Sequence, residues 1–121
     1  AAGTAGHFEG LGAEYSMNRM ADVMPYVVGR RASAPDGTTA AFQITGLSGI
    51  SMSIGVTNGR ASRLGSEPDE PTVTLVMESE VFLRLCCGRI DPEEALNARA
   101  VKIAGNLRLG EAIVQQMNYM P

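Results

Sequence analysis

Apolar residues at three- and four-residue spacing mark the first regular element of the chain. They are Met17, Met20, Ala21, Met24, Val27 and Val28, within the segment YSMNRMADVMPYVVGRRA. This spacing places them on one side of an amphipathic helix. Pro25 has no amide hydrogen and its ring clashes with the preceding turn. The helix is therefore either kinked at Met24 or followed by a second helix that has Pro25 in its first turn.

The next part of the chain alternates between apolar and polar residues, which predicts strands that each have one apolar face. Two such strands lie within residues 38–46 and 49–57. Asn58-Gly59 directly after them is a strong β-hairpin signal, since both residues accept the positive φ of a type I′ turn. A third strand is expected over residues 59–65 and, after a polar loop, a fourth over residues 71–77.

Capping residues mark the helices in the last third of the chain. A helix is expected to begin at Glu78 or Ser79 and to stop at Gly88, a residue suited to the left-handed turn after a helix end. Asp91 is a good N-cap for a second short helix, with proline in its first turn. A strand around Val101 and a C-terminal helix capped by Asn106 complete the order.

This succession predicts an α+β fold: a mainly antiparallel sheet of about five strands, with helices packed on one face. A chain of 121 residues is one domain by size. We assign residues 15–121 to that domain and residues 1–14, rich in alanine and glycine, to a flexible N-terminal segment or tag remnant.

Composition argues against several functional classes. A net charge of −3 with no basic stripe disfavours nucleic-acid binding. No apolar run approaches the roughly 20 residues that span a bilayer, and no signal peptide is recognisable, so we expect a soluble, cytoplasmic protein. His7, in the flexible segment, is the single histidine. We therefore predict no catalytic residue, metal site or cofactor within this chain.

Two adjacent cysteines, Cys86 and Cys87, form the most conspicuous candidate for chemistry. On a helix, Cys86 falls on the apolar side and Cys87 near its polar edge. Cys87 would lie at the helix C-terminus, where the helix dipole disfavours a thiolate. No further cysteine is available for a zinc site. We interpret Cys86 as a core residue and Cys87 as a poorly activated thiol.

The C-terminal helix is the second candidate. Its polar side carries Arg108, Glu111, Gln115 and Asn118, and its other side carries Leu109, Gly110, Ile113, Met117 and Met120. Methionine is flexible and polarizable, so such a face adapts to irregular apolar shapes. Two interpretations stay open for this face: it lines an apolar ligand cavity, or it packs in an ordinary core.

Several landmarks in fixed order resemble the sterol carrier protein type 2 family. They are a strand hairpin with an Asn-Gly turn, then PTVTLVMESEVFLRL, then Gly-Arg-Ile-Asp-Pro before an Ala-Leu helix, then VKIAGNL into a last helix, over roughly residues 38–120. The preceding MPYVVGRRASAPDG is similar to the linker helix of actinobacterial proteins related to mycothiol-dependent maleylpyruvate isomerase.

The first resemblance implies a cavity for lipids or fatty acyl chains, between the C-terminal helix and the sheet. Carried over to this sequence, the lining would be Met52, Ile54, Phe82, Leu85, Cys86, Leu109, Ile113, Met117 and Met120. The isomerase resemblance implies that the metal and its histidines belong to a separate N-terminal helical domain, which this chain lacks.

Three functional hypotheses follow. The first is a binding module for a lipid or other apolar molecule, with no activity of its own. The second is an accessory domain of a thiol-dependent isomerase or transferase, whose partner is the metal-binding helical domain. The third is a homodimer formed through the second sheet face, where Ser51, Ser53, Thr72 and Thr74 leave the surface less covered.

Overall fold

The computed structural model describes residues 17–47 and 49–118. Within them the chain forms one sheet, in the spatial order β3-β2-β1-β4-β5. The strands are β1 (Thr39–Thr45), β2 (Ile50–Thr57), β3 (Arg60–Arg63), β4 (Val73–Glu78) and β5 (Val101–Gly105). Pairing is parallel between β1 and β4 and antiparallel in the other three pairs. The mainly antiparallel five-stranded sheet expected from the sequence is thus confirmed.

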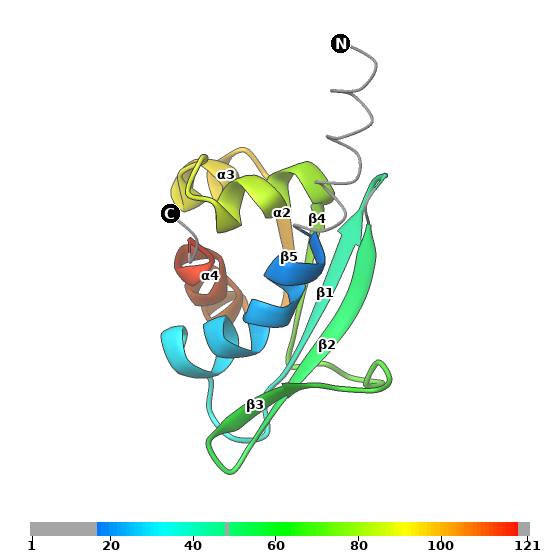
Figure 1. Cartoon of the computed structure of the whole chain (residues 1–121). Coiled ribbons are helices and arrows are strands. Elements are labelled where there is room, and N and C mark those ends of the chain that lie inside the picture. Colours follow the sequence, from blue (N-terminus) through cyan, green and yellow to red (C-terminus); the bar gives the residue numbers. More distant parts are fainter. Residues whose placement is uncertain (1–16, 48, 119–121) are drawn as a thin grey trace.

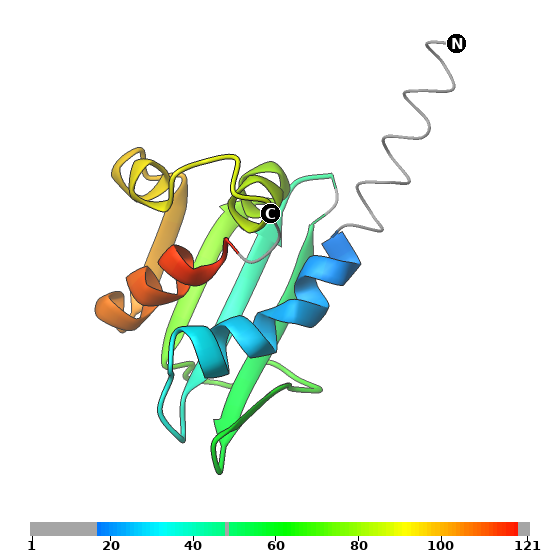
Figure 2. The same ribbon diagram turned by 60° about the vertical axis from the view of Figure 1, so that its left-hand side comes forward.

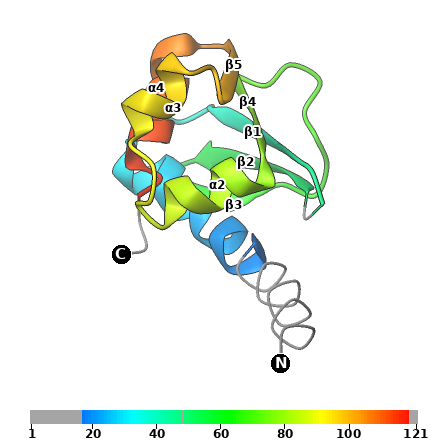
Figure 3. The ribbon, with the colours of Figure 1, turned by 90° about the horizontal axis from the view of Figure 1, so that it is seen from above.

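All helices lie on one face of the sheet (Figures 1 and 2). Residues 17–26 are α-helical and continue into the π-helical turn η1 (Val27–Arg31). The later helices are α2 (Ser79–Cys86), α3 (Pro92–Asn97) and α4 (Leu107–Gln116). α4 and the helix at residues 17–31 run across the covered face of the sheet, and α2 and α3 lie at one end of it (Figure 2). Seen from that end, along the strands, the helices lie together on one side of the sheet (Figure 3).

The first helix differs from its prediction at Pro25. The chain does not break at Met24 but stays α-helical through Tyr26. The hydrogen bonds then switch to a spacing of five residues, as the bond from the Ala32 amide to the Val27 carbonyl at 2.8 Å shows. Pro25 has no amide hydrogen to donate to the Ala21 carbonyl, so the helix lacks one backbone hydrogen bond at this point and still continues past it.

The predicted turns and caps are confirmed. Asn58 and Gly59 have φ values of 53° and 77°, as a type I′ hairpin requires. The Asp91 carboxylate accepts a hydrogen bond from the Glu93 amide at 3.1 Å, and the Asn106 side chain accepts one from the Leu109 amide at 3.0 Å. These local bonds fix where α3 and α4 begin.

The core lies between the sheet and the helices. Phe42 at the centre of β1 is paired with Met52 on β2 and Leu75 on β4, and all three side chains are buried on the helix-covered side. The alternating pattern of the sequence thus gives the correct inner face for each of these strands.

The opposite face of the sheet is more covered than the sequence suggests. Ser53 is only 6 % exposed, and the loop after β3 shields this part of the sheet. There the Leu64 amide donates to the Ser53 carbonyl at 2.8 Å, and the Leu64 side chain lies against Gly55. Of the four polar residues named for this face, Ser53 is therefore covered, because a loop with no periodic pattern folds over it, whereas Ser51 is exposed and Thr72 and Thr74 are partly exposed. Homodimer formation stays a prediction.

Candidate functional site

The nine residues predicted to line a cavity are mostly core residues. Ile54, Phe82, Leu85, Cys86, Ile113 and Met117 are fully buried, and Met52 is nearly so. Leu109 is partly buried against this core, and Met120 lies outside the described residues. The structure thus brings eight of them into one apolar cluster between the sheet, α2 and α4.

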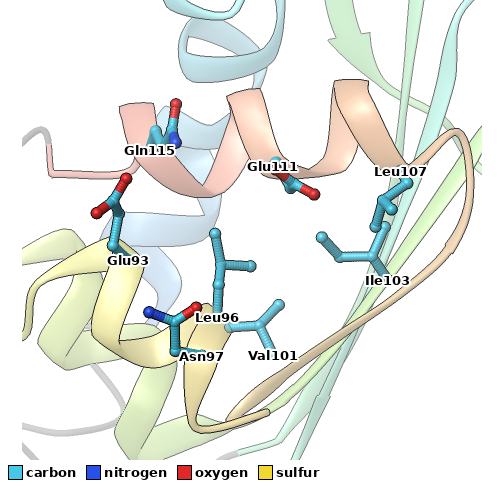
Figure 4. Close-up of a pocket in the computed structure, with 8 residues that line it drawn as sticks. All are labelled: Glu93, Leu96, Asn97, Val101, Ile103, Leu107, Glu111 and Gln115. Carbon is cyan, nitrogen blue, oxygen red and sulfur yellow. The ribbon is translucent and has the colours of Figure 1, made fainter.

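A cleft of about 360 Å³ lies beside this cluster, between α3, β5 and α4 (Figure 4). Four of its eight lining residues are aliphatic: Leu96 from α3, Val101 and Ile103 from β5, and Leu107 from the first turn of α4. Val101 belongs to the core, and Leu96 and Ile103 pack against it. The cleft therefore borders the core directly.

Polar side chains form the rim of the cleft. Glu93 and Asn97 come from α3, and Glu111 and Gln115 come from α4. Figure 4 shows these four side chains around the aliphatic ones. No lysine or arginine is among the eight residues that line the cleft. Two carboxylates and two amides can accept hydrogen bonds from a neutral ligand, and the carboxylates repel an anionic one.

Local features of the chain place α4 against β5. Gly105 ends β5 with a φ of 90°, which lets the strand turn directly into the helix. The Asn106 amide then donates to the Thr72 carbonyl at 2.9 Å, which ties the turn to the start of β4. Gly110 faces Ile103 so closely that even a methyl group there would be too near the Ile103 side chain. The cleft beside them owes its shape to this close approach.

The sequence pattern does not predict the lining of the cleft. It places Glu111 and Gln115 on the polar side of α4, whereas the predicted cavity lies along the apolar side of this helix. In the structure the cleft runs along the polar side, since the apolar side is packed in the core. The sequence contains one signal for this side: Leu107 is an apolar residue in the first turn of α4, away from the apolar stripe. In the structure its side chain is 57 % exposed.

The two cysteines have the predicted environments. Cys86 is fully buried, and Cys87 is partly buried at the end of α2, where its amide donates to the Leu83 carbonyl at 3.0 Å. Burial, with a smaller contribution from the neighbouring Cys87, raises the pKa of the Cys86 thiol from 9.0 to about 12. A thiol that holds its proton so strongly is a poor nucleophile and a poor metal ligand. Among the described residues, no group of three or more potential metal-binding side chains comes together.

The raised pKa of Cys86 predicts a pH dependence of stability. The unfolded chain releases this proton near pH 9, whereas the folded protein keeps it up to about pH 12. Stability from this group is therefore complete below pH 9 and falls as the pH rises from 9 towards 12. Urea unfolding at several pH values should show a shallower decline for Cys86→Ala than for the unchanged protein. Cys87→Ala is the matched control, and equal slopes for Cys86→Ala and the unchanged protein would contradict this assignment.

A family model, that of the SCP-2 sterol transfer family, matches residues 27–118, which include every strand of the sheet. The chain belongs to the SCP-2 sterol transfer family. No curated protein is significantly similar to it in sequence. The family match confirms the resemblance to sterol carrier proteins, whereas the narrower one to mycothiol-dependent isomerases remains a hypothesis.

Solved structures of the same fold agree with this SCP-2 assignment. Sterol carrier protein 2 like 2 from Aedes aegypti has a TM-score of 0.63 at 15 % identity, over 84 % of this chain and 95 % of that one. Sterol carrier protein 2 from Aedes aegypti, in complex with palmitate, has a TM-score of 0.56 at 16 % identity, over 84 % of this chain and 97 % of that one.

The same fold also occurs within a longer chain. The sec-alkyl sulfatase PisA1 of Pseudomonas sp. has a TM-score of 0.56 at 19 % identity, over 67 % of this SCP-2 family chain but only 13 % of the sulfatase. In the part of our chain that the structure describes, no helix is long and apolar enough to cross a membrane.

Proposed function

We propose that this SCP-2 family domain is a non-catalytic module that binds a lipid, an acyl chain or another apolar small molecule beside α4. The observation that carries the proposal is the cleft between α3, β5 and α4, where aliphatic side chains from all three elements lie inside a polar rim, and three of them belong to the core or pack against it. The palmitate complex of the Aedes aegypti protein, which shares the fold, supports a lipid as the class of ligand.

The apolar cluster next to the cleft would extend the site. A chain longer than the cleft would pass Val101 and enter between α4 and the sheet, towards Ile113 and Met117. This is where the nine residues carried over from the family resemblance would contact it. Methionine side chains can adopt several rotamers at similar energy, so Met117 can move aside more easily than a branched residue.

The rim of the cleft favours a neutral head group. Glu93 and Glu111 would repel a free carboxylate, whereas a hydroxyl can donate a hydrogen bond to either of them. We therefore propose fatty alcohols, acylglycerols or similar neutral lipids as better ligands than free fatty acids. Affinity should come mainly from the tail, at about 0.8 kcal/mol per buried methylene.

Titration of the delipidated protein with fatty alcohols of increasing length tests the proposal. Affinity should rise by roughly tenfold for each two added methylenes until the cleft is filled. Leu107→Asp should weaken binding by about tenfold or more, because it replaces an apolar side chain that would contact the tail with a hydrated charge. Leu47→Asp is the matched control, since Leu47 is a fully exposed leucine in the turn after β1.

Two results would contradict the proposed function. One is the absence of binding at micromolar concentrations by any alcohol in the series. The other is equal loss of affinity in Leu107→Asp and Leu47→Asp, which would show that the cleft is not the site. Circular dichroism spectra of both variants establish that they are folded.

A second candidate function is that of an accessory domain in a larger enzyme. The likeness to part of the sec-alkyl sulfatase supports it, because there the same fold makes up a small share of an enzyme chain. The specific hypothesis is a thiol-dependent isomerase or transferase whose metal-binding helical domain is separate from this chain. The gene sequence upstream of residue 1 tests it: a preceding helical region with several histidines is expected, and a start codon near residue 1 would contradict it.

A further inference from the structure

A second pocket, of about 480 Å³, lies at the end of the sheet where β4 leads into α2 and β5 begins. Figure 1 shows α2 and α3 at this end of the sheet. Three aliphatic side chains contribute to its lining: Val76 from β4, Val81 from α2 and Ala100 from the segment before β5. Val76 is paired with Lys102, on the sheet face opposite the helices. This pocket shares no lining residue with the cleft beside α4.

The net charge of this pocket is opposite in sign to that of the cleft beside α4. Arg99 and Lys102 supply two positive charges and Glu78 one negative charge, so the net charge of the lining is +1. No side-chain hydrogen bond or ion pair joins Arg99 or Lys102 to another described residue. Glu78 is the N-cap residue of α2, and its side chain makes no capping hydrogen bond. Two cations beside an aliphatic surface are suited to a ligand with a carboxylate and a short apolar part.

The backbone at Arg99 supplies an independent observation. Arg99 follows α3 with a φ of 58°, a left-handed conformation in which glycine is the usual residue. Two backbone hydrogen bonds close the turn. The Arg99 amide donates to the Leu96 carbonyl at 3.1 Å, and the Ala100 amide donates to the Ala95 carbonyl at 2.9 Å. Both hydrogen bonds join backbone atoms only, so the turn does not require an arginine side chain at position 99. The fold thus accepts an unfavourable conformation for an arginine whose side chain has no structural partner among the described residues, at the edge of a pocket.

We infer that the pocket between α2, β4 and β5 binds a small amphipathic carboxylate, with Arg99 and Lys102 at its anionic end and Val76 and Val81 against its apolar part. This site is separate from the proposed neutral-lipid site and does not depend on it. Glu78 sets a limit on affinity, because its carboxylate faces the same pocket.

Titration with octanoate, below its micelle-forming concentration, and with 1-octanol tests the inference by NMR. Octanoate should shift the amide signals of Val81, Ala100 and Lys102, and octanol at equal concentration should shift them much less. Lys102→Gln should weaken octanoate binding by roughly two- to fivefold, the range expected for one exposed charge. Glu78→Gln should strengthen it by a similar factor, and added salt should weaken it.

Arg99→Gly separates the binding role from a structural one. It should weaken octanoate binding like Lys102→Gln, while its melting temperature stays equal to that of the unchanged protein or rises by a few degrees. Arg108→Gln is the control for net charge, since Arg108 is an exposed residue of α4 outside the pocket. It should leave octanoate binding unchanged.

Three outcomes would overturn the inference. They are equal shifts by octanol and octanoate at the α2–β5 pocket, octanoate shifts centred on Leu96 and Leu107, and equal weakening by Arg108→Gln and Lys102→Gln. The second outcome would place the anion in the α4 cleft, so failure of this inference is distinguishable from failure of the proposed function, which the fatty-alcohol series decides.

Discussion

Phe82→Ala is expected to lower the free energy of unfolding by about 3 to 5 kcal/mol. Phe82 is fully buried in the apolar cluster beneath α2, and its removal leaves a cavity that the surrounding side chains cannot fill. Urea unfolding of the delipidated protein measures the change. Leu47→Ala is the control, because Leu47 is fully exposed and should change stability by less than about 0.5 kcal/mol.

The Phe82 experiment also decides between the two interpretations of the predicted cavity residues. A core residue contributes to the free energy of unfolding whether or not lipid is bound. If delipidated Phe82→Ala is as stable as the unchanged protein while fatty-alcohol binding is lost, Phe82 contributes to a ligand cavity rather than to the core. That result would contradict the packing seen in the structure.

Gly110→Val is expected to destabilise the protein by about 3 kcal/mol. Extra side-chain atoms in a packed contact typically cost 1 to 3 kcal/mol, and here the first added carbon already overlaps Ile103 and lies 3.1 Å from Val73 Cγ2. Ile103 is branched at Cβ and therefore has little freedom to move aside. The energetic cost of this overlap is larger than the gain in helix propensity. Replacing a glycine in a helix can bring at most about 1 kcal/mol.

Thermal unfolding compares Gly110→Val with Gly65→Val. A Cβ atom at Gly65 would meet nothing within 4 Å, so this control should change stability little. A second test is the pair Gly110→Ala and Ile103→Ala. The double variant should be more stable than the sum of the two single changes predicts. Ile103→Ala removes the atoms that a methyl group at position 110 would overlap, and that methyl group partly fills the space that Ile103→Ala leaves. Strict additivity would contradict the close contact between α4 and β5.

The elements of the fold could be predicted from the sequence because their signals are local. Alternation of apolar and polar residues identifies a strand and its inner face, as Phe42 and Leu75 show. Capping residues identify the starts of helices, as Asp91 and Asn106 show. These features depend on a few neighbouring residues, so they can be predicted without knowledge of the fold.

The candidate site could be predicted only in part, because it depends on the spacing between elements. The apolar side of α4 is the correct inner side, but the sequence does not reveal whether the space beneath it is open or filled. Ile113 and Met117 fill it, and the cleft opens instead along the side that carries Glu111. Neither helix periodicity nor composition contains that information.

The sequence alone determined the α+β class, the hairpin at Asn58-Gly59, the core position of Cys86 and the family resemblance that the family match confirmed. Only the tertiary structure decided that β4 pairs with β1 in parallel and that Leu64 covers part of the outer face. It also brought Arg99 and Lys102 to one pocket. The physical reason is the separation in sequence of the interacting residues. Turns, caps and periodicity arise from neighbours in the chain, whereas strand order, clefts and charge clusters arise from contacts between distant segments.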